Sequence, residues 1–598
     1  MAPNDEHNNN GSEEPFDEDA PGQAISVPDA GDTGDSGKLK MIVQLVKKCL
    51  GVKDIAAMRL SLPASLLEPI PNLEYWHYLD RPDLFAAIND SDDPFQRMLA
   101  VLRFTFSKDL KFIRGKVCKP YNSVLGEHFR SHWDVLPVSY HPSDPHHPPI
   151  QHLYLSEAAA ESTYSTASLS AVPAGTRISA SETASIKSGK STKSGMSSLS
   201  FLSKAYSSPS TPGGKDTPAT SPSLFEADLD AQISSLSLSN ADASTSSELL
   251  EADSPSSSTE NTSDIPSKRV RVVYLTEQVS HHPPVSAFTA ACPSRHLELT
   301  GIDQISAKVS GTTVRVMPGS FNKGFFVKVT GGHGNGEVYQ VTHPVASVNG
   351  ILRGSFYVTV SESTIITCTG PPGKDGKPTE YLRAIIEYKE ESWLGRAHFL
   401  CEGVIHTYVP GETAHEEWTK VKHVPRSRVV ATFDGSWKHM IRWKRVQPYP
   451  FSPSSSSLAS TSNTAKQDEY STLIDISTLH VIPKQVRPLS KQLPNESRKL
   501  WENVTTKLLA KEYGDATKHK HIIEQKQRDD AAERKKKGVQ FTPRYFEPDL
   551  STGIPILTEE GHKALLEETK EESLHPLEDV PSVFGQIPVK AEDEPSSS

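Results

Sequence analysis

The sequence of 598 residues is poor in cysteine and has no long apolar run. Its cysteines are odd in number, widely spaced and without any CxxC pair: Cys49, Cys118, Cys292, Cys368 and Cys401. This pattern argues against a disulfide framework and against structural zinc, and it fits a reducing compartment. No stretch of about 18 consecutive apolar residues occurs, so no segment is expected to span a membrane.

The chain also lacks a secretory signal and an excess of positive charge. Its N-terminus, MAPNDEHNNNGSEEPFDEDA, is acidic and polar, which excludes a signal peptide. The formal net charge of -11 argues against general nucleic-acid binding. A cytoplasmic protein is therefore expected.

Apolar residues are scarce enough to limit the folded part of the chain. Hydrophobic residues make up only 36%, and Ser, Thr and Pro gather in a few blocks. We predict a disordered acidic tail at 1–36, a disordered Ser/Thr/Pro-rich insertion at 137–267 and an acidic C-terminal tail at 549–598. One folded domain, built from 37–136 and 268–548, remains. The insertion is expected at its surface, between neighbouring strands.

The folded part reads as α+β. Between Val270 and about Val446, short alternating runs are separated by Gly, Pro and Asn, which predicts a large antiparallel sheet closed as a barrel. Before it, residues 92–110 predict a helix with Pro94 in its first turn and its apolar side packed on the sheet. After it, residues 487–537 predict helices interrupted near Gly514.

A short amphipathic helix is predicted at residues 38–50. Leu39, Ile42 and Val46 recur at helical spacing, and Gly51 is suited to end the helix. Most such helices simply pack on a core. A basic polar face, as seen here, is also typical of a helix at a membrane surface.

Two adjacent histidines stand at the end of a predicted strand. Residues 269–277 alternate apolar and charged side chains and lead into His281-His282-Pro283-Pro284. Because proline cannot donate to a sheet ladder, the two imidazoles are expected where the sheet stops pairing and a ligand has access. The same tetrapeptide recurs at 146–149 without a preceding strand pattern, and we interpret that copy as loop.

Two further segments carry cationic and amide side chains. Residues 119–122 read Lys-Pro-Tyr-Asn, and Lys520, Glu524 and Arg528 follow one another at i, i+4, i+8 on a predicted helix. That spacing keeps the three side chains on one helix face over roughly 12 Å. Taken alone, such a pattern is more typical of a solvated charged face.

Together these segments resemble the oxysterol-binding-protein-related lipid-transfer family. The histidine-proline segment, the KPYN segment and the Lys520 helix occur in the family's order, as do LGEHF, PVASVNGILRG, FDGSW and PNESRKLW. The resemblance covers about residues 38–136 and 268–548. Because no pleckstrin-type domain or ankyrin repeat pattern precedes residue 38, we expect a short member with the ligand-binding domain only.

The resemblance implies a near-closed β-barrel with a central lipid tunnel, a helical C-terminal subdomain and a lid formed by the helix at 38–50, with Leu39, Ile42 and Val46 as its apolar residues. It implies exchange of a sterol or phosphatidylserine for phosphatidylinositol 4-phosphate between membranes, without catalysis, cofactor or metal. The implied site for the phosphorylated headgroup is a ring of donors and cations: Lys119, Asn122, His281, His282, Lys520, Glu524 and Arg528.

Other interpretations stay open beside lipid exchange. A lipid sensor, or a tether at membrane contact sites that binds lipid without net transport, fits the same residues. Residues 223–228 (SLFEAD) faintly resemble an acidic-tract motif that binds endoplasmic-reticulum receptors, although the first aromatic residue is missing. Peripheral location at endoplasmic reticulum, Golgi or plasma-membrane contacts is expected. A hydrolase is disfavoured because no nucleophile elbow is present.

Overall fold

The computed structural model describes the chain in several ranges, which are residues 25–26, 35–56, 60–114, 118–144, 146–152, 269–351, 356–371, 380–391, 397–447 and 469–571. Most of both predicted tails, and residues 153–267 of the predicted insertion, lie outside these ranges, so the predicted disorder of the N-terminal tail and of the insertion stays a prediction. At the start of that insertion, Ser139 and Ile150 form an antiparallel bridge and Val138 is buried. The second histidine-proline copy, at 146–149, lies in a loop as expected.

A 15-stranded antiparallel sheet dominates the fold, which confirms the predicted architecture. A separate parallel pair joins β1 (Ile25–Ser26) to β2 (Leu60–Ser61). The strands of the large sheet are β3 (His128–Val135), β4 (Val270–His281), β5 (Pro284–Cys292), β6 (Leu297–Ser310), β7 (Thr313–Pro318), β8 (Phe325–Val329), β9 (Val338–Val341), β10 (Val345–Asn349), β11 (Tyr357–Ser361), β12 (Ser363–Thr369), β13 (Tyr381–Tyr388), β14 (Leu400–Tyr408), β15 (Val429–Ser436), β16 (Met440–Arg445) and β17 (Ser471–Asp475).

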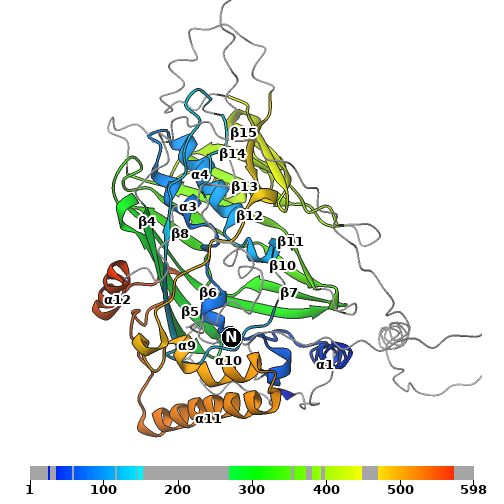
Figure 1. The fold of residues 1–598 in the computed structure, drawn as a ribbon. Helices are drawn as coiled ribbons and strands as arrows, with labels where there is room; N and C mark the ends of the chain where they lie inside the picture. The colour runs from blue at the N-terminus through cyan, green and yellow to red at the C-terminus, as the bar shows by residue number, and fades with distance from the viewer. Residues whose placement is uncertain are drawn as a thin grey trace, which may run out of the picture. The chain divides into compact units, whose positions relative to one another are not determined.

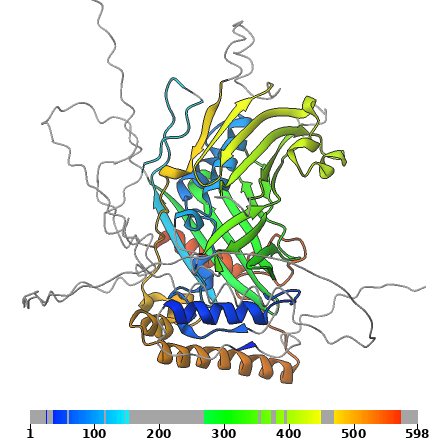
Figure 2. The ribbon, with the colours of Figure 1, turned by 90° about the vertical axis from the view of Figure 1, so that its right-hand side faces the viewer.

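The sheet branches at β6 and nearly closes on itself (Figures 1 and 2). One side of β6 pairs with β5, while the other side pairs first with β8 and then with β7. From β8 the sheet continues through β9 and β12 to β17, and from β7 it continues to β10 and β11. The chain after β17 then returns to β3, where Gln485 and His132 exchange two backbone hydrogen bonds of 3.0 and 2.7 Å.

Helices fill one end of this barrel. The elements between residues 72 and 114 are α2 (Asn72–Tyr75), α3 (Pro82–Ala86), α4 (Pro94–Ser107) and α5 (Lys111–Arg114). The Asp93 carboxylate accepts a hydrogen bond of 2.8 Å from the Phe95 N–H and so caps α4. Strands enclose α3 and α4 in Figure 1, and α4 packs on β13 and β17. The predicted helix is therefore buried nearly all round rather than on one side alone.

Helices α1 (Asp35–Lys48), α9 (Ser497–Leu500), α10 (Glu502–Leu509) and α11 (Tyr513–Lys537) build a second apolar cluster (Figure 2). Its fully or largely buried members are Met41, Leu62, Ala64, Leu67, Tyr121, Trp501, Val504, Leu508 and Ala516. The helix break predicted near Gly514 falls just before α11, where Lys511 has a φ of +60°. No helix in the described ranges is long and apolar enough to cross a membrane.

The packing side of α1 differs from the predicted stripe. Leu39, Ile42 and Val46 are half-buried, whereas Met41 and Cys49 are buried. The reason is tertiary packing. Helix α1 packs on the short helical turn at 64–66 and on the C-terminal helices, and these contacts determine which of its residues are buried.

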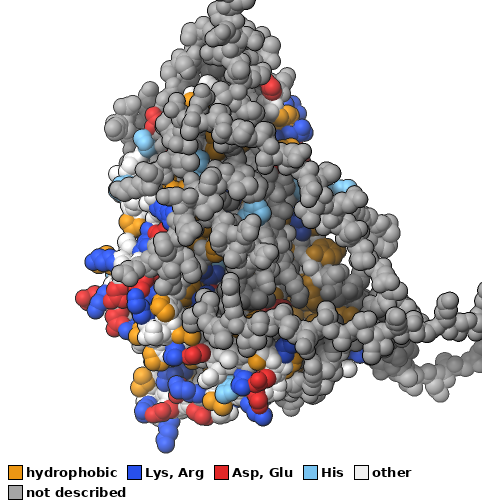
Figure 3. Space-filling model, viewed as in Figure 1, with side chains coloured by type: hydrophobic (Ala, Val, Ile, Leu, Met, Phe, Trp, Pro, Cys, Tyr) orange, Lys and Arg blue, Asp and Glu red, His pale blue; other side chains and the backbone are white. Residues whose placement is uncertain are grey.

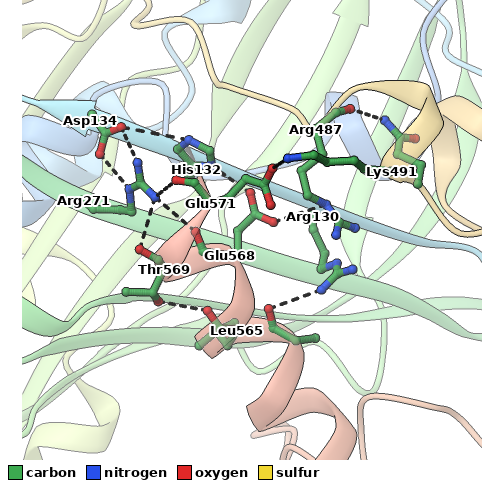
Figure 4. A network of polar contacts seen from close by, with 12 residues as sticks. Arg130, His132, Asp134, Arg271, Arg487, Lys491, Leu565, Glu568, Thr569 and Glu571 are labelled. Carbon is green, nitrogen blue, oxygen red and sulfur yellow. Dashed lines mark hydrogen bonds and ion pairs between the residues drawn. The ribbon is translucent and has the colours of Figure 1, made fainter. Parts of the chain in front are cut away.

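A final helix, α12 (Glu559–Lys570), lies within the segment predicted as an acidic tail. It packs on β3 and β4, with the Glu568 carboxylate 2.7 Å from the His132 ring (Figure 4). Arg271 of β4 donates to the carbonyls of Thr569 and Glu571 at the helix end. The acidic character that suggested a tail instead complements basic side chains on the sheet.

Candidate functional site

The KPYN loop (residues 119–122) is fixed by its tyrosine. Tyr121 is fully buried, its ring centroid lies 4.9 Å from that of Trp501, and its hydroxyl lies 3.0 Å from the Thr505 hydroxyl. The flanking Lys119 and Asn122 stay exposed, and the Lys119 ammonium donates to Asn122 Oδ1 at 2.7 Å. The anchored tyrosine thus presents a cation and an amide side by side.

Helix α11 brings a second cation to this loop. Lys520 is 2% exposed and its ammonium lies 2.5 Å from Glu524 Oε1, so the predicted pairing on this helix face is present. Although part of Lys119 is exposed, its ammonium is surrounded by protein: desolvation, and then the positive charge of Lys520, lower the pKa of Lys119 to about 8. Arg528 is exposed, and its guanidinium donates to Gln525 Oε1 at 3.0 and 3.2 Å.

The two histidines form the tip of the β4–β5 hairpin. His281 ends β4 opposite Pro284, and the His282–Pro283 peptide is cis. Gln278 Nε2 donates to the Ser280 carbonyl at 2.7 Å, next to an irregularity in the strand pairing. Although neighbours on a regular strand face opposite sides, the turn brings the two rings together, with centroids 4.5 Å apart. Both side chains are half-buried.

The start of β3 connects this hairpin to the far end of α11. The Gly126 N–H donates to the Gln278 carbonyl at 2.9 Å, and the Gln278 N–H donates to the Glu127 carbonyl at 2.8 Å. A Cβ on Gly126 would lie 3.3 Å from the ring of Phe541, whose centroid is 5.8 Å from the guanidinium of Arg534. Helix α11 therefore runs from the KPYN loop at Lys520 to the β3–β4 pair that carries the histidines.

The structure thus brings some of the predicted site residues into contact and places others further away. Lys119, Asn122, Lys520 and Glu524 form one group by direct contact or charge interaction. The histidines are positioned by the adjoining hairpin, and Arg528 lies on the surface of α11. Blue and red side chains are interspersed over the end of the molecule where α10 and α11 lie (Figure 3).

Sequence patterns missed the buried acids that hold these elements in place. Glu127 is fully buried and accepts hydrogen bonds from the Ser497 hydroxyl at 2.7 Å and the Trp501 indole at 3.0 Å. Burial raises its pKa to about 7, although these donors oppose the shift. Glu277 on β4 likewise accepts from the N–H groups of residues 544 and 545, and burial raises its pKa to about 7. The only sequence signal was the LGEHF and PNESRKLW resemblance.

The side chains of the site differ from a set of metal ligands. Within the part of the chain that the structure describes, no group of three His, Cys, Asp or Glu side chains could hold a metal ion. The arrangement instead offers ammonium groups, an amide and imidazoles, which are donors suited to a phosphorylated or carboxylate ligand.

The comparisons with protein families and with individual proteins point to the same family. The family model described as oxysterol-binding protein matches residues 41–184 and 259–572. Oxysterol-binding protein-like protein 1 of Schizosaccharomyces pombe is 37% identical over 544 residues, which is 90% of this chain and 93% of that protein. Human oxysterol-binding protein-related protein 10 is 28% identical over 283 residues, which is 47% of this chain and 30% of that protein.

Among solved structures, the Osh1 ORD domain in complex with cholesterol covers 93% of both chains with 16% identity and a TM-score of 0.47. The family model spans most of the folded domain, and the fission-yeast relative matches nearly the whole length of both chains. The chain belongs to the oxysterol-binding protein family.

Proposed function

We propose that this protein binds one lipid at a time inside its barrel and exchanges a sterol or phosphatidylserine for phosphatidylinositol 4-phosphate between membranes, without covalent chemistry. The observation that carries the proposal is the proximity of Lys520 to the KPYN loop, where its positive charge acts on Lys119 beside Asn122. The positive charge of Lys520 acts on Lys119, and Lys520 itself pairs with the Glu524 carboxylate. A doubly charged phosphate would relieve this repulsion.

The histidine hairpin complements the two lysines. Imidazole N–H groups donate to phosphate oxygens, and a bound anion favours the protonated ring. Backbone hydrogen bonds connect Gln278, near the hairpin tip, to residues 126 and 127, shortly after the KPYN loop. We therefore propose that one headgroup meets donors from three remote parts of the chain. Asn122 adds a neutral amide to the same set.

The exposure of β7, β10 and β11 supports a hollow interior. A strand with one face on a solid core alternates between buried and exposed residues. In these three strands nearly every residue on both faces is partly exposed, whereas β8 and β13 are mostly buried. An enclosed space is what lipid transport needs, because exposing two acyl chains to water costs on the order of 20 kcal/mol.

Extraction of phosphatidylinositol 4-phosphate from liposomes tests the proposal. Lys119→Ala and the double change His281→Ala/His282→Ala are expected to abolish extraction while the circular-dichroism spectrum stays unchanged. Lys526→Ala is the matched control, since Lys526 lies on α11, is largely exposed and pairs with Asp530. Normal extraction by the Lys119 and histidine variants would refute the proposed site.

Transfer kinetics separate exchange from sensing. A carrier moves many lipids per protein molecule between donor and acceptor liposomes when protein is substoichiometric. Retention of one tightly bound lipid would instead favour a sensor or a contact-site tether. We place this activity at endoplasmic reticulum, Golgi or plasma-membrane contacts. The weaker receptor motif at 223–228 lies outside the described residues and stays a hypothesis.

A further inference from the structure

In the described sheet, the second half of β6 pairs with another strand along one edge and not along the other. On one side, β5 pairs with β6 from Leu297 to Gln304 and stops there, because β5 begins at Pro284, opposite the end of β4. Strand β6 continues to Ser310, paired only with β7 on its other side. Within the described ranges, the backbone groups of residues 305–310 that face away from β7 therefore have no neighbouring strand.

The segment that follows α1 covers this edge. The Ile55 N–H donates to the Ala307 carbonyl at 2.6 Å, and the Ala307 N–H donates to Asp54 Oδ1 at 2.8 Å. Because both backbone groups of Ala307 point to residues 54 and 55, they point away from Val316, its partner on β7. We call these two bonds the Asp54–Ala307 contact.

The Asp54 side chain is set for this role by its own turn. Its Oδ1 also accepts the Ala56 N–H at 2.9 Å, a local bond that fixes the carboxylate relative to the chain. Gly51, with a φ of +82°, ends the preceding helical segment and turns the chain toward β6. A side chain without an acceptor at position 54 would remove the hydrogen-bond partner of the N–H of the buried Ala307.

The contact lies near the histidine hairpin. Gln304 is the last residue of β6 opposite β5 and pairs with Val285, three positions after His282. Ala307 follows three residues later, so it lies about 10 Å further along the strand. Residues 54 and 55 therefore bind the part of β6 that begins just after its pairing with β5, the second strand of the histidine hairpin.

We propose that Asp54 is a positioning residue that holds α1 and residues 49–56 on the open edge of β6, and that breaking the Asp54–Ala307 contact speeds lipid release. The second half of this inference rests on the proposed function. The first half concerns the lipid-free protein alone. The Asp54 carboxylate accepts from the N–H groups of Ala307 and Ala56, so we assign it a role in holding the segment after α1 and not in binding the ligand.

Hydrogen exchange of the full-length, lipid-free protein tests the contact itself. In Asp54→Ala, amide exchange in peptides covering 305–310 is expected to rise about tenfold, the factor that corresponds to the loss of one charge-assisted hydrogen bond. Asp54→Asn keeps an acceptor oxygen and is expected to restore protection. Lys53→Ala, a change at the exposed neighbour, is the control and should leave protection unchanged. Equal protection in Asp54→Ala and the unchanged chain would overturn the contact.

Release of fluorescent phosphatidylinositol 4-phosphate from loaded protein to acceptor liposomes tests the functional half. Asp54→Ala is expected to release lipid several-fold faster, and Asp54→Asn is expected to release it at the normal rate. Identical rates in all variants, despite altered exchange at 305–310, would overturn the role in release while the contact stands. If no variant binds lipid, the proposed function fails, and the exchange experiment still decides the contact.

Discussion

The positive charge of Lys520 acts on the ammonium group of Lys119, although about four hundred residues of sequence separate the two lysines. Lys119 belongs to a loop anchored by a buried tyrosine, and Lys520 belongs to the first half of α11. Desolvation, and then the positive charge of Lys520, lower the pKa of Lys119 and so disfavour its charged state. This is the electrostatic basis for the phosphate site that we propose here.

Extraction of phosphatidylinositol 4-phosphate should weaken as pH rises through about 8. The pKa of Lys119 is lowered to about 8, so the ligand meets a charged lysine below that pH and increasingly a neutral one above it. Extraction measured from pH 6.5 to 9.5 checks this. Lys119→Arg should flatten the profile because arginine keeps its charge throughout. A decline of the same steepness in that variant would show that another group titrates.

The lowered pKa of Lys119 also affects the free energy of unfolding, which should rise with pH while lipid extraction falls. Between about pH 8 and the ordinary lysine pKa near 10.4, unfolded chains hold a proton at Lys119 that the folded protein has lost. Stability contributed by this residue should therefore rise with pH in that window. Urea unfolding of the unchanged chain and of Lys119→Met, followed at pH 8 and pH 10, checks the sign. A smaller gain in Lys119→Met is expected, and an equal gain would contradict the assignment.

Glu127 should make the protein less stable as pH rises from about 4.5 to 7. Its pKa is raised to about 7 in the folded state, so the folded protein holds more protons than the unfolded chain in that window. Glu127→Gln should flatten the decline, and Trp501, whose indole donates to Glu127, reports unfolding by fluorescence. Parallel pH profiles of the two proteins would contradict the prediction.

Removing Glu568 should cost about 3 kcal/mol of unfolding free energy. This carboxylate is 1% exposed, and its loss would leave the buried His132 Nδ1 without the oxygen that lies 2.7 Å from it. The control is Glu560→Ala on the same helix, whose pair with Arg544 is exposed, so a loss below about 1 kcal/mol is expected. Equal losses in denaturant titrations would mean that α12 does not stabilise the sheet.

Gly126→Ala should destabilise the protein by about 1–2 kcal/mol and weaken lipid extraction. Its φ is +77°, and an added Cβ would lie 3.3 Å from the Phe541 ring, so the chain after α11 must shift. Gly514→Ala is the matched control, because that position in α11 has open space around an added Cβ. There a gain of up to about 1 kcal/mol is expected from helix propensity. Thermal unfolding and liposome extraction measure both effects.

Local patterns were sufficient to predict most of the elements. Alternation between Val270 and Val446 predicted the antiparallel sheet, and Pro94 with the preceding aspartates predicted the start of α4. The buried side of α1 was predicted less well, because Leu39, Ile42 and Val46 are only half-buried while Met41 is buried. Periodicity shows which residues share a face, but the neighbouring elements decide which face is packed.

The acidic segment after residue 548 shows a second limit. Low apolar content and negative charge are typical of a tail, yet α12 packs through Ala564 and Glu568 on β3 and β4. Its stability depends on basic partners, among them His132 and Arg271, that are remote in sequence. A charge can be judged as solvated or paired only once its neighbours in space are known.

By itself, the sequence determined the types of elements, their order and the chemical character of the three segments expected to bind a headgroup, since these depend on local periodicity, turn residues and side-chain chemistry. Only the tertiary structure decided that Lys119 meets Lys520, that the two histidine rings lie together at a hairpin tip and that Asp54 reaches Ala307. Those relationships depend on strand register and on helix packing across long stretches of chain, and no local pattern encodes either of them.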